Sequence, residues 1–187
     1  METEMKKILM ALALLFAFGV PALAQEKASG EKKEAAKEEK KTEVDYLKPY
    51  RTKGNTWTWK SVSKMSGYES VAYTKYEVTE VTEEKATCKV STLDKDKKEL
   101  ASTTTEIPLK ATKTETPKDG TPAPEVKTSE EKIKVEAGEI DCIKVETEAN
   151  GAKTTSWTCK ATGLLVKSQT SASWGESTME LVEMSVK

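Results

Sequence analysis

The segment CIKVETEANGAKTTSWTC runs from Cys142 to Cys159 and holds a turn signal at its centre. Asn150-Gly151 is the dipeptide that most strongly favours a two-residue type I′ turn between antiparallel strands. Such a turn places Ala149 opposite Ala152, and counting outward along both arms brings Cys142 opposite Cys159. The alternation of the ladder makes this a non-hydrogen-bonded pair, with Cα atoms about 4.5 Å apart, which is within reach of a disulfide. The sequence therefore predicts a hairpin that is bridged between its two cysteines.

The N-terminus predicts a compartment in which a disulfide persists. Lys6 and Lys7 precede an apolar run over 8–20, and Ala22-Leu23-Ala24 forms a small-x-small cleavage signal before Gln25. We therefore interpret residues 1–24 as a signal peptide that is cleaved after Ala24. The residue after the cleavage signal is not cysteine, so a lipoprotein is not expected. No later segment reaches the roughly 20 apolar residues of a membrane span, so we expect a periplasmic or secreted chain without a transmembrane segment.

The remaining chain divides by composition. Residues 25–43 carry almost no apolar side chains, which predicts a disordered, charged tether. A charged arm that contacts the cell wall or a membrane surface is the alternative. Residues 44–187 form one domain's length of chain. Within it, residues 113–131 contain three prolines and a glycine without an apolar period, so we expect an exposed loop there.

The domain is expected to be mainly β, because Thr, Val and Ser dominate and few stretches show a helical period. Short strands joined by hairpins predict an antiparallel sheet. A turn or two of helix is expected only over 44–50. The apolar phase changes between Tyr73 and Tyr76, which indicates a bulge or two partly covered faces. The expected strands are 56–64, 69–81, 85–93, 99–109, 132–136, the two arms of the Asn-Gly hairpin, 164–171 and 178–186.

The chemistry-bearing residues do not indicate an enzyme. The chain has no histidine, which removes the usual base for serine or cysteine nucleophiles and the commonest metal ligand. We therefore expect no catalytic site, no metal and no cofactor. Cys88 is predicted to stay a free thiol, as a small buried strand residue. The alternatives are that it pairs with another chain or displaces one partner of the hairpin bridge. A net charge of −1 also argues against nucleic-acid binding, which normally needs a basic patch.

The four tryptophans admit two interpretations. Trp57 and Trp59 share one face of their strand, and the hairpin register places Trp157 opposite Lys144 on the face of the two paired cysteines. These indoles could belong to a core. They could instead line an apolar groove for a ligand or partner, together with Trp174 in a later turn.

A resemblance extends over the C-terminal part of the chain. The pattern Gly138-x-Ile140-x-Cys142-x-Lys144-Val145-Glu146, then Trp157, then Gly163-Leu164-Leu165-Val166-Lys167, resembles the lipoprotein-carrier (LolA/LolB-like) half-barrel domains of exported bacterial proteins. That resemblance implies a single, strongly curved antiparallel sheet. It also implies helices across the concave face, which this sequence does not supply, and in some members the binding of an acyl chain or a hydrophobic partner.

Three functions remain open from the sequence. The first is a non-catalytic exported module that binds a lipid-like ligand or a partner segment on its curved sheet. The second is a structural or interaction protein of the cell envelope with no small-molecule ligand. The third, an enzyme, has the least support, because no catalytic constellation is recognisable.

Overall fold

The computed structural model describes residues 44–110 and 126–187. The predicted signal peptide, its cleavage site, the predicted tether and residues 113–125 of the predicted loop lie outside the described residues.

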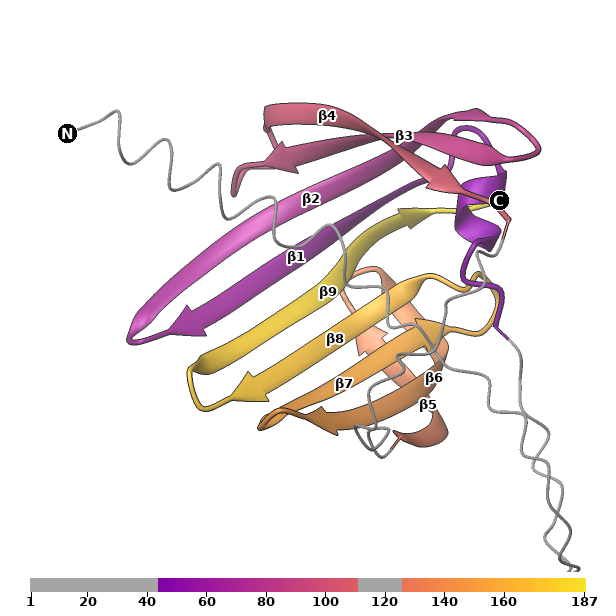
Figure 1. Ribbon diagram of the computed structural model, residues 1–187. Coiled ribbons are helices and arrows are strands. Elements are labelled where there is room, and N and C mark those ends of the chain that lie inside the picture. The colour runs from indigo at the N-terminus through magenta and orange to yellow at the C-terminus, as the bar shows by residue number, and fades with distance from the viewer. Residues whose placement is uncertain (1–43, 111–125) are drawn as a thin grey trace, which may run out of the picture. The chain divides into compact units, whose positions relative to one another are not determined.

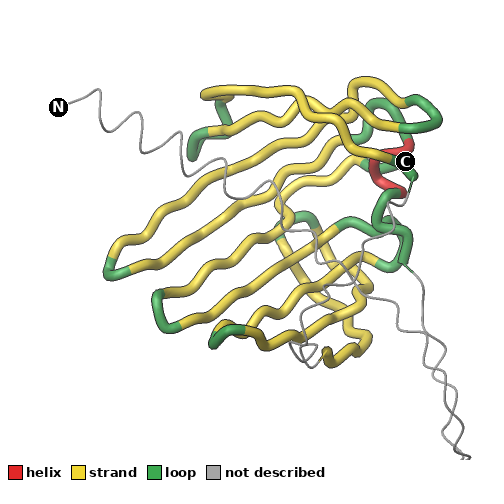
Figure 2. The backbone as a smooth tube through the Cα atoms, viewed as in Figure 1, coloured by secondary structure: helices red, strands yellow, loops and turns green. Residues whose placement is uncertain are grey.

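A single antiparallel sheet contains all nine strands of the described residues, in the order β4-β3-β2-β1-β9-β8-β7-β6-β5 (Figures 1 and 2). Strands β1 to β4 form one meander and β5 to β9 form another, and the pairing of β1 with β9 joins them. β4 and β5 are the two edges and do not pair with each other, so the sheet is not closed into a barrel. The elements are η1 (Lys48–Arg51), β1 (Thr56–Met65), β2 (Tyr68–Val81), β3 (Lys85–Leu93), β4 (Glu99–Pro108), β5 (Val126–Val135), β6 (Gly138–Ala149), β7 (Ala152–Cys159), β8 (Leu165–Ala172) and β9 (Gly175–Ser185).

The predicted Asn-Gly hairpin is confirmed in its turn and in its register. Asn150 and Gly151 have φ angles of 52° and 74°, the left-handed values that both central residues of a type I′ turn require. Ala149 faces Ala152, and Cys142 faces Cys159. The short helix expected before the first strand is also present, as the 3-10 turn η1.

The sheet curves so that its β5–β6 end reaches back to β9. The backbone N–H of Ala137, in the β5–β6 turn, donates to the carbonyl of Leu181 in β9 at 3.3 Å. Lys97, in the β3–β4 turn, forms ion pairs with Glu136 beside Ala137 and with Glu183 of β9. The expected strongly curved, open antiparallel sheet is therefore confirmed.

The core is one cluster of buried side chains contributed by both meanders. Leu181 and Val166 are fully buried at its centre, and Val78 of β2 and Ile140 of β6 belong to the same cluster. The segment before β1 closes one side: Gly163 lies so close to it that a Cβ there would come within 2.0 Å of the Asp45 carbonyl oxygen.

One sequence prediction was wrong in position. The strand predicted from residue 132 begins at Val126, because β5 is a solvent-exposed edge strand whose polar residues pair with β6 from Val126 onward. A loop over 113–131 therefore extends at least six residues too far.

The register shift in β2 lies beyond Val78, whereas Tyr73 and Tyr76 pair regularly with β1 on opposite, half-buried faces. The second of the two explanations offered for their phase change is the correct one.

Candidate functional site

The two paired cysteines lie in the buried part of the β6–β7 hairpin. Cys142 is fully buried, and Cys159 is nearly so. All three cysteines are free thiols in this structure, and Cys142 Sγ donates to the Ile140 carbonyl oxygen at 3.5 Å. Burial, with smaller contributions from Cys159 and nearby carboxylates, raises the pKa of Cys142 to about 12. The register thus permits the predicted bridge, and the bridge itself stays a prediction.

Cys88 lies in β3 opposite Val78 and is also fully buried. Burial raises the pKa of its thiol to about 11. A thiol that holds its proton so firmly is a poor nucleophile, since the thiolate is the reactive form. Its position fits a small buried strand residue.

Trp57 and Trp59 form an aromatic group with two tyrosines. The Trp57 ring stacks on Tyr76 at 5.5 Å and meets the edge of Tyr50 at 5.2 Å, while the Trp59 ring lies 5.2 Å from Tyr76. Trp59 Nε1 donates to the Leu165 carbonyl oxygen at 2.9 Å, whereas Trp57 Nε1 is buried without a partner. These rings contact one another and therefore occupy the space that a groove would leave open.

The other two tryptophans lie apart from each other. Trp157 of β7 is 8% exposed and belongs to the same buried cluster as Trp57 and Trp59. Trp174 is 55% exposed in the β8–β9 turn and lies outside that cluster. The structure thus brings three of the four predicted tryptophans together.

A row of charged residues crosses the sheet on both sides of Trp157. We call it the charged row, and its members face one another on successive strands: Lys144, Trp157, Lys167, Glu180 and Lys60. Lys144 Nζ and Lys167 Nζ lie 5.9 and 6.0 Å from the Trp157 ring centroid, near the outer limit of a cation–π contact. Lys167 also pairs with Glu180 at 3.2 Å.

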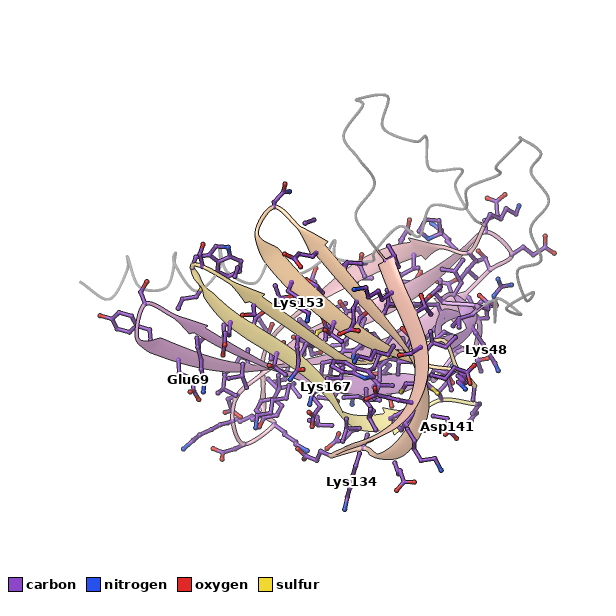
Figure 3. All side chains as sticks on the ribbon, turned by 90° about the horizontal axis from the view of Figure 1, so that it is seen from below. Lys48, Glu69, Lys134, Asp141, Lys153 and Lys167 are labelled. Atoms are coloured by element: carbon purple, nitrogen blue, oxygen red, sulfur yellow. The ribbon has the colours of Figure 1, made fainter. Side chains whose placement is uncertain are left out.

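An open hollow of about 270 Å³ adjoins the charged row, two residues further along the strands. Its lining is hydroxyl, amide and charged side chains: Lys153, Thr155, Gln169, Thr170, Ser171, Glu176, Ser177 and Thr178. Figure 3 shows Lys153 and Lys167 over the middle strands, whereas Lys134 and Asp141 project away from the β5–β6 end. This part of the sheet can offer hydrogen bonds and charge, and none of the described residues that line the hollow is apolar.

The β6–β7 half of this site could be predicted, because the Asn-Gly register pairs Lys144 with Trp157. The β8 half could not. A register shift beside Trp157 decides which β8 residue faces it, and the sequence carries no signal for that shift. The three residues that complete the row, Lys167, Glu180 and Lys60, were therefore missed.

The described residues contain no group of three or more cysteine or carboxylate side chains that could hold a metal ion. Among the same residues, no helix is long and apolar enough to cross a membrane. The strongest perturbation of a carboxyl lies on the surface, where hydrogen bonds from Lys89, Ser91 and Ser102 lower the pKa of Glu99 to about 2. An ion pair explains that shift without a catalytic role.

The chain matches no protein-family model. It also matches no curated protein.

Several solved structures are similar at low identity. A candidate lipoprotein from Parabacteroides distasonis is 12% identical, with a TM-score of 0.46 over 76% of this chain and 100% of its own. A candidate exported protein with a YmcC-like fold from Bacteroides fragilis is 10% identical, with a TM-score of 0.44 over 72% and 97%. The MucA/MucB complex of Pseudomonas aeruginosa contains a chain that is 10% identical, with a TM-score of 0.46 over 75% and 53%. These similarities assign no residue role and no ligand to this chain.

Proposed function

We propose that this chain is an exported, non-catalytic domain of the cell envelope that binds a polar polypeptide segment along the charged row and the adjoining hollow. Export is supported by the signal-like segment over residues 1–24 and its small-x-small cleavage signal. The absence of histidine from the whole sequence supports a role without catalysis.

The single observation that carries the proposal is where the buried indole rings lie. Trp57 and Trp59 pack against Tyr50 and Tyr76, and Trp157 is buried between two lysines. An acyl chain needs a contiguous apolar surface, because each buried methylene contributes only about 0.8 kcal/mol and a charged lining removes that gain. The hollow next to the charged row is lined by polar and charged residues. A peptide can use its hydrogen bonds on such a lining, whereas Lys144 and Lys167 already pair with neighbouring glutamates.

A photo-crosslinking amino acid at two positions tests this proposal. Gln169 lines the hollow, whereas Lys134 projects away from the sheet (Figure 3). In cells that export the full chain, we expect a polypeptide adduct from position 169 and none from position 134.

A matched pair of charge reversals then tests the contact. Lys153→Glu in the hollow should reduce the adduct at position 169, and Lys134→Glu should leave it unchanged. Equal adducts from both positions would contradict the proposal. A lipid retained by the purified protein in native mass spectrometry would support the ligand-carrier alternative instead.

A further inference from the structure

Three hairpin turns end side by side at the same margin of the sheet (Figure 1). Register pairs connect them into a continuous line, which we call the rim: Ala149, Ala152, Ala172, Gly175, Met65 and Tyr68. The turn residues between them are Asn150-Gly151, Ser173-Trp174 and Ser66-Gly67. None of these residues is charged, in a chain in which 33% of residues are.

The rim carries three of the seven large apolar side chains that are exposed among the described residues. Tyr68 is 83% exposed, Trp174 is 55% exposed and Met65 is 50% exposed. Two of the hairpins touch directly, because a Cβ on Gly175 would lie 2.3 Å from the Lys64 carbonyl oxygen and 3.1 Å from Met65 Cγ. The β1–β2 and β8–β9 turns are therefore in contact at Met65 and Gly175, beside Tyr68 and Trp174.

Charge begins immediately behind the rim. The next line of register pairs, which we call the second row, is Glu148, Lys153, Ser171, Glu176, Lys64 and Glu69. It is nearly balanced in sign, and Lys64 pairs with Glu69 at 3.3 Å. One residue of strand separates an uncharged margin from a charged one, a step of about 3.3 Å.

We propose that the rim docks on a lipid bilayer, with Tyr68, Trp174 and Met65 inserted at the level of the headgroups. Tyr and Trp favour this level because an apolar ring and a polar group are satisfied there together. Charged side chains are costly deeper in the bilayer, so the second row would stop insertion at one residue's depth.

The size of the rim argues for a bilayer over a protein partner. A stable protein interface buries about 800 Å² on each side and uses roughly 20 to 30 residues. Three narrow turns supply fewer residues, and they lie along a margin of the sheet (Figure 1). Shallow insertion into a fluid interface does not need that area.

Flotation of the full chain with phosphatidylcholine vesicles tests the proposal. We expect the wild type to float with the vesicles, and the double variant Tyr68→Ser, Trp174→Ser to bind about tenfold more weakly. Leu100→Ser is the matched control, because Leu100 is 63% exposed on the edge strand β4, away from the rim. It should float like the wild type. Ala149→Glu, which adds a charge to the rim and removes no ring, should also weaken flotation.

Fluorescence identifies the inserted residue. Trp174 is the one exposed tryptophan of the four in the sequence, so brominated lipid should quench it, and Trp174→Phe should remove the quenching. Binding should change little with salt, because the rim is uncharged. Failure of the wild type to float, equal loss in Leu100→Ser, or loss of binding in high salt would each overturn the proposal. A salt-stable dimer that does not float would assign the rim to protein contact and would also overturn it.

Discussion

At the residue scale, the three cysteines differ in what faces them. Cys142 and Cys159 face each other in a ladder fixed by the Asn150-Gly151 turn, while Cys88 faces Val78 in the other meander. A slip of one residue would send every side chain of the hairpin to the opposite face. The turn therefore decides which thiols can meet.

We predict that the exported protein contains a Cys142–Cys159 disulfide and a free Cys88. Cys142→Ser should then lower the free energy of unfolding by about 3 kcal/mol, since the bridge constrains the unfolded chain. Cys88→Ala should leave the bridge intact. Peptide mapping without reduction checks the pairing. A peptide joining Cys88 to either partner would contradict the register, and three free thiols would remove the bridge while leaving the hairpin in place.

Reduction of the Cys142–Cys159 disulfide should also make the free energy of unfolding depend on pH. In the folded, reduced chain, burial raises the pKa of Cys142 from its ordinary value of 9.0 to about 12. The unfolded chain releases this proton first, so the stabilisation is complete below pH 9 and is lost as the pH rises toward 12. The oxidised chain has no such proton. The difference in unfolding midpoint between oxidised and reduced Cys88→Ala protein should therefore widen above pH 9, and a constant difference would contradict the shift.

Trp57 and Trp59 differ by one hydrogen bond. Trp59 Nε1 satisfies the Leu165 carbonyl, whereas Trp57 Nε1 is buried without a partner. Replacing Trp59 with Phe should leave that carbonyl without its hydrogen-bond donor. Replacing Trp57 with Phe should remove an unsatisfied donor. We expect Trp59→Phe to be the more destabilising change by about 1 kcal/mol in denaturant unfolding. The reverse order would show that ring packing outweighs the hydrogen bond.

At the element scale, local signals located the strands well wherever a turn or an apolar alternation was present. The arms of the Asn-Gly hairpin were predicted residue by residue, because that turn fixes both strand ends. β5 was predicted too short, since its first seven residues are all exposed and show no apolar alternation. The bulge beyond Val78 depends on how β3 pairs, which no local signal reports.

Two glycines at equal φ give a test of packing between elements. Gly151 and Gly163 both have φ of 74°, so an alanine at either position carries the same backbone strain of about 1 kcal/mol. A Cβ at Gly151 meets open space, while one at Gly163 collides with the Asp45 carbonyl. Gly163→Ala should therefore be the more destabilising of the two in thermal or denaturant unfolding. Equal losses would mean that the segment before β1 moves away freely.

At the scale of the whole molecule, the sheet class followed from composition and hairpin spacing, but the joining of its two meanders did not. The pairing of β1 with β9 joins residues more than a hundred positions apart, and no motif in either strand specifies it. The same holds for the candidate site. The partners of Trp157 on β6 were predictable, and those beyond β7 came from a register shift.

Buried core contacts and exposed ion pairs both connect the parts of the curved sheet. One pair of variants distinguishes their contributions to stability. Leu181 is fully buried where the two meanders meet, and its carbonyl accepts the Ala137 N–H. Lys97 joins Glu136 and Glu183 across the same region, but its side chain is 38% exposed and water screens it.

Leu181→Ala should lower the free energy of unfolding by about 2 to 5 kcal/mol, because it removes buried contacts and leaves a cavity. Lys97→Met should barely move the unfolding midpoint, and added salt should shift the wild type equally little. A loss for Lys97→Met as large as that for Leu181→Ala would show that the ion pairs, rather than the core, hold the curve.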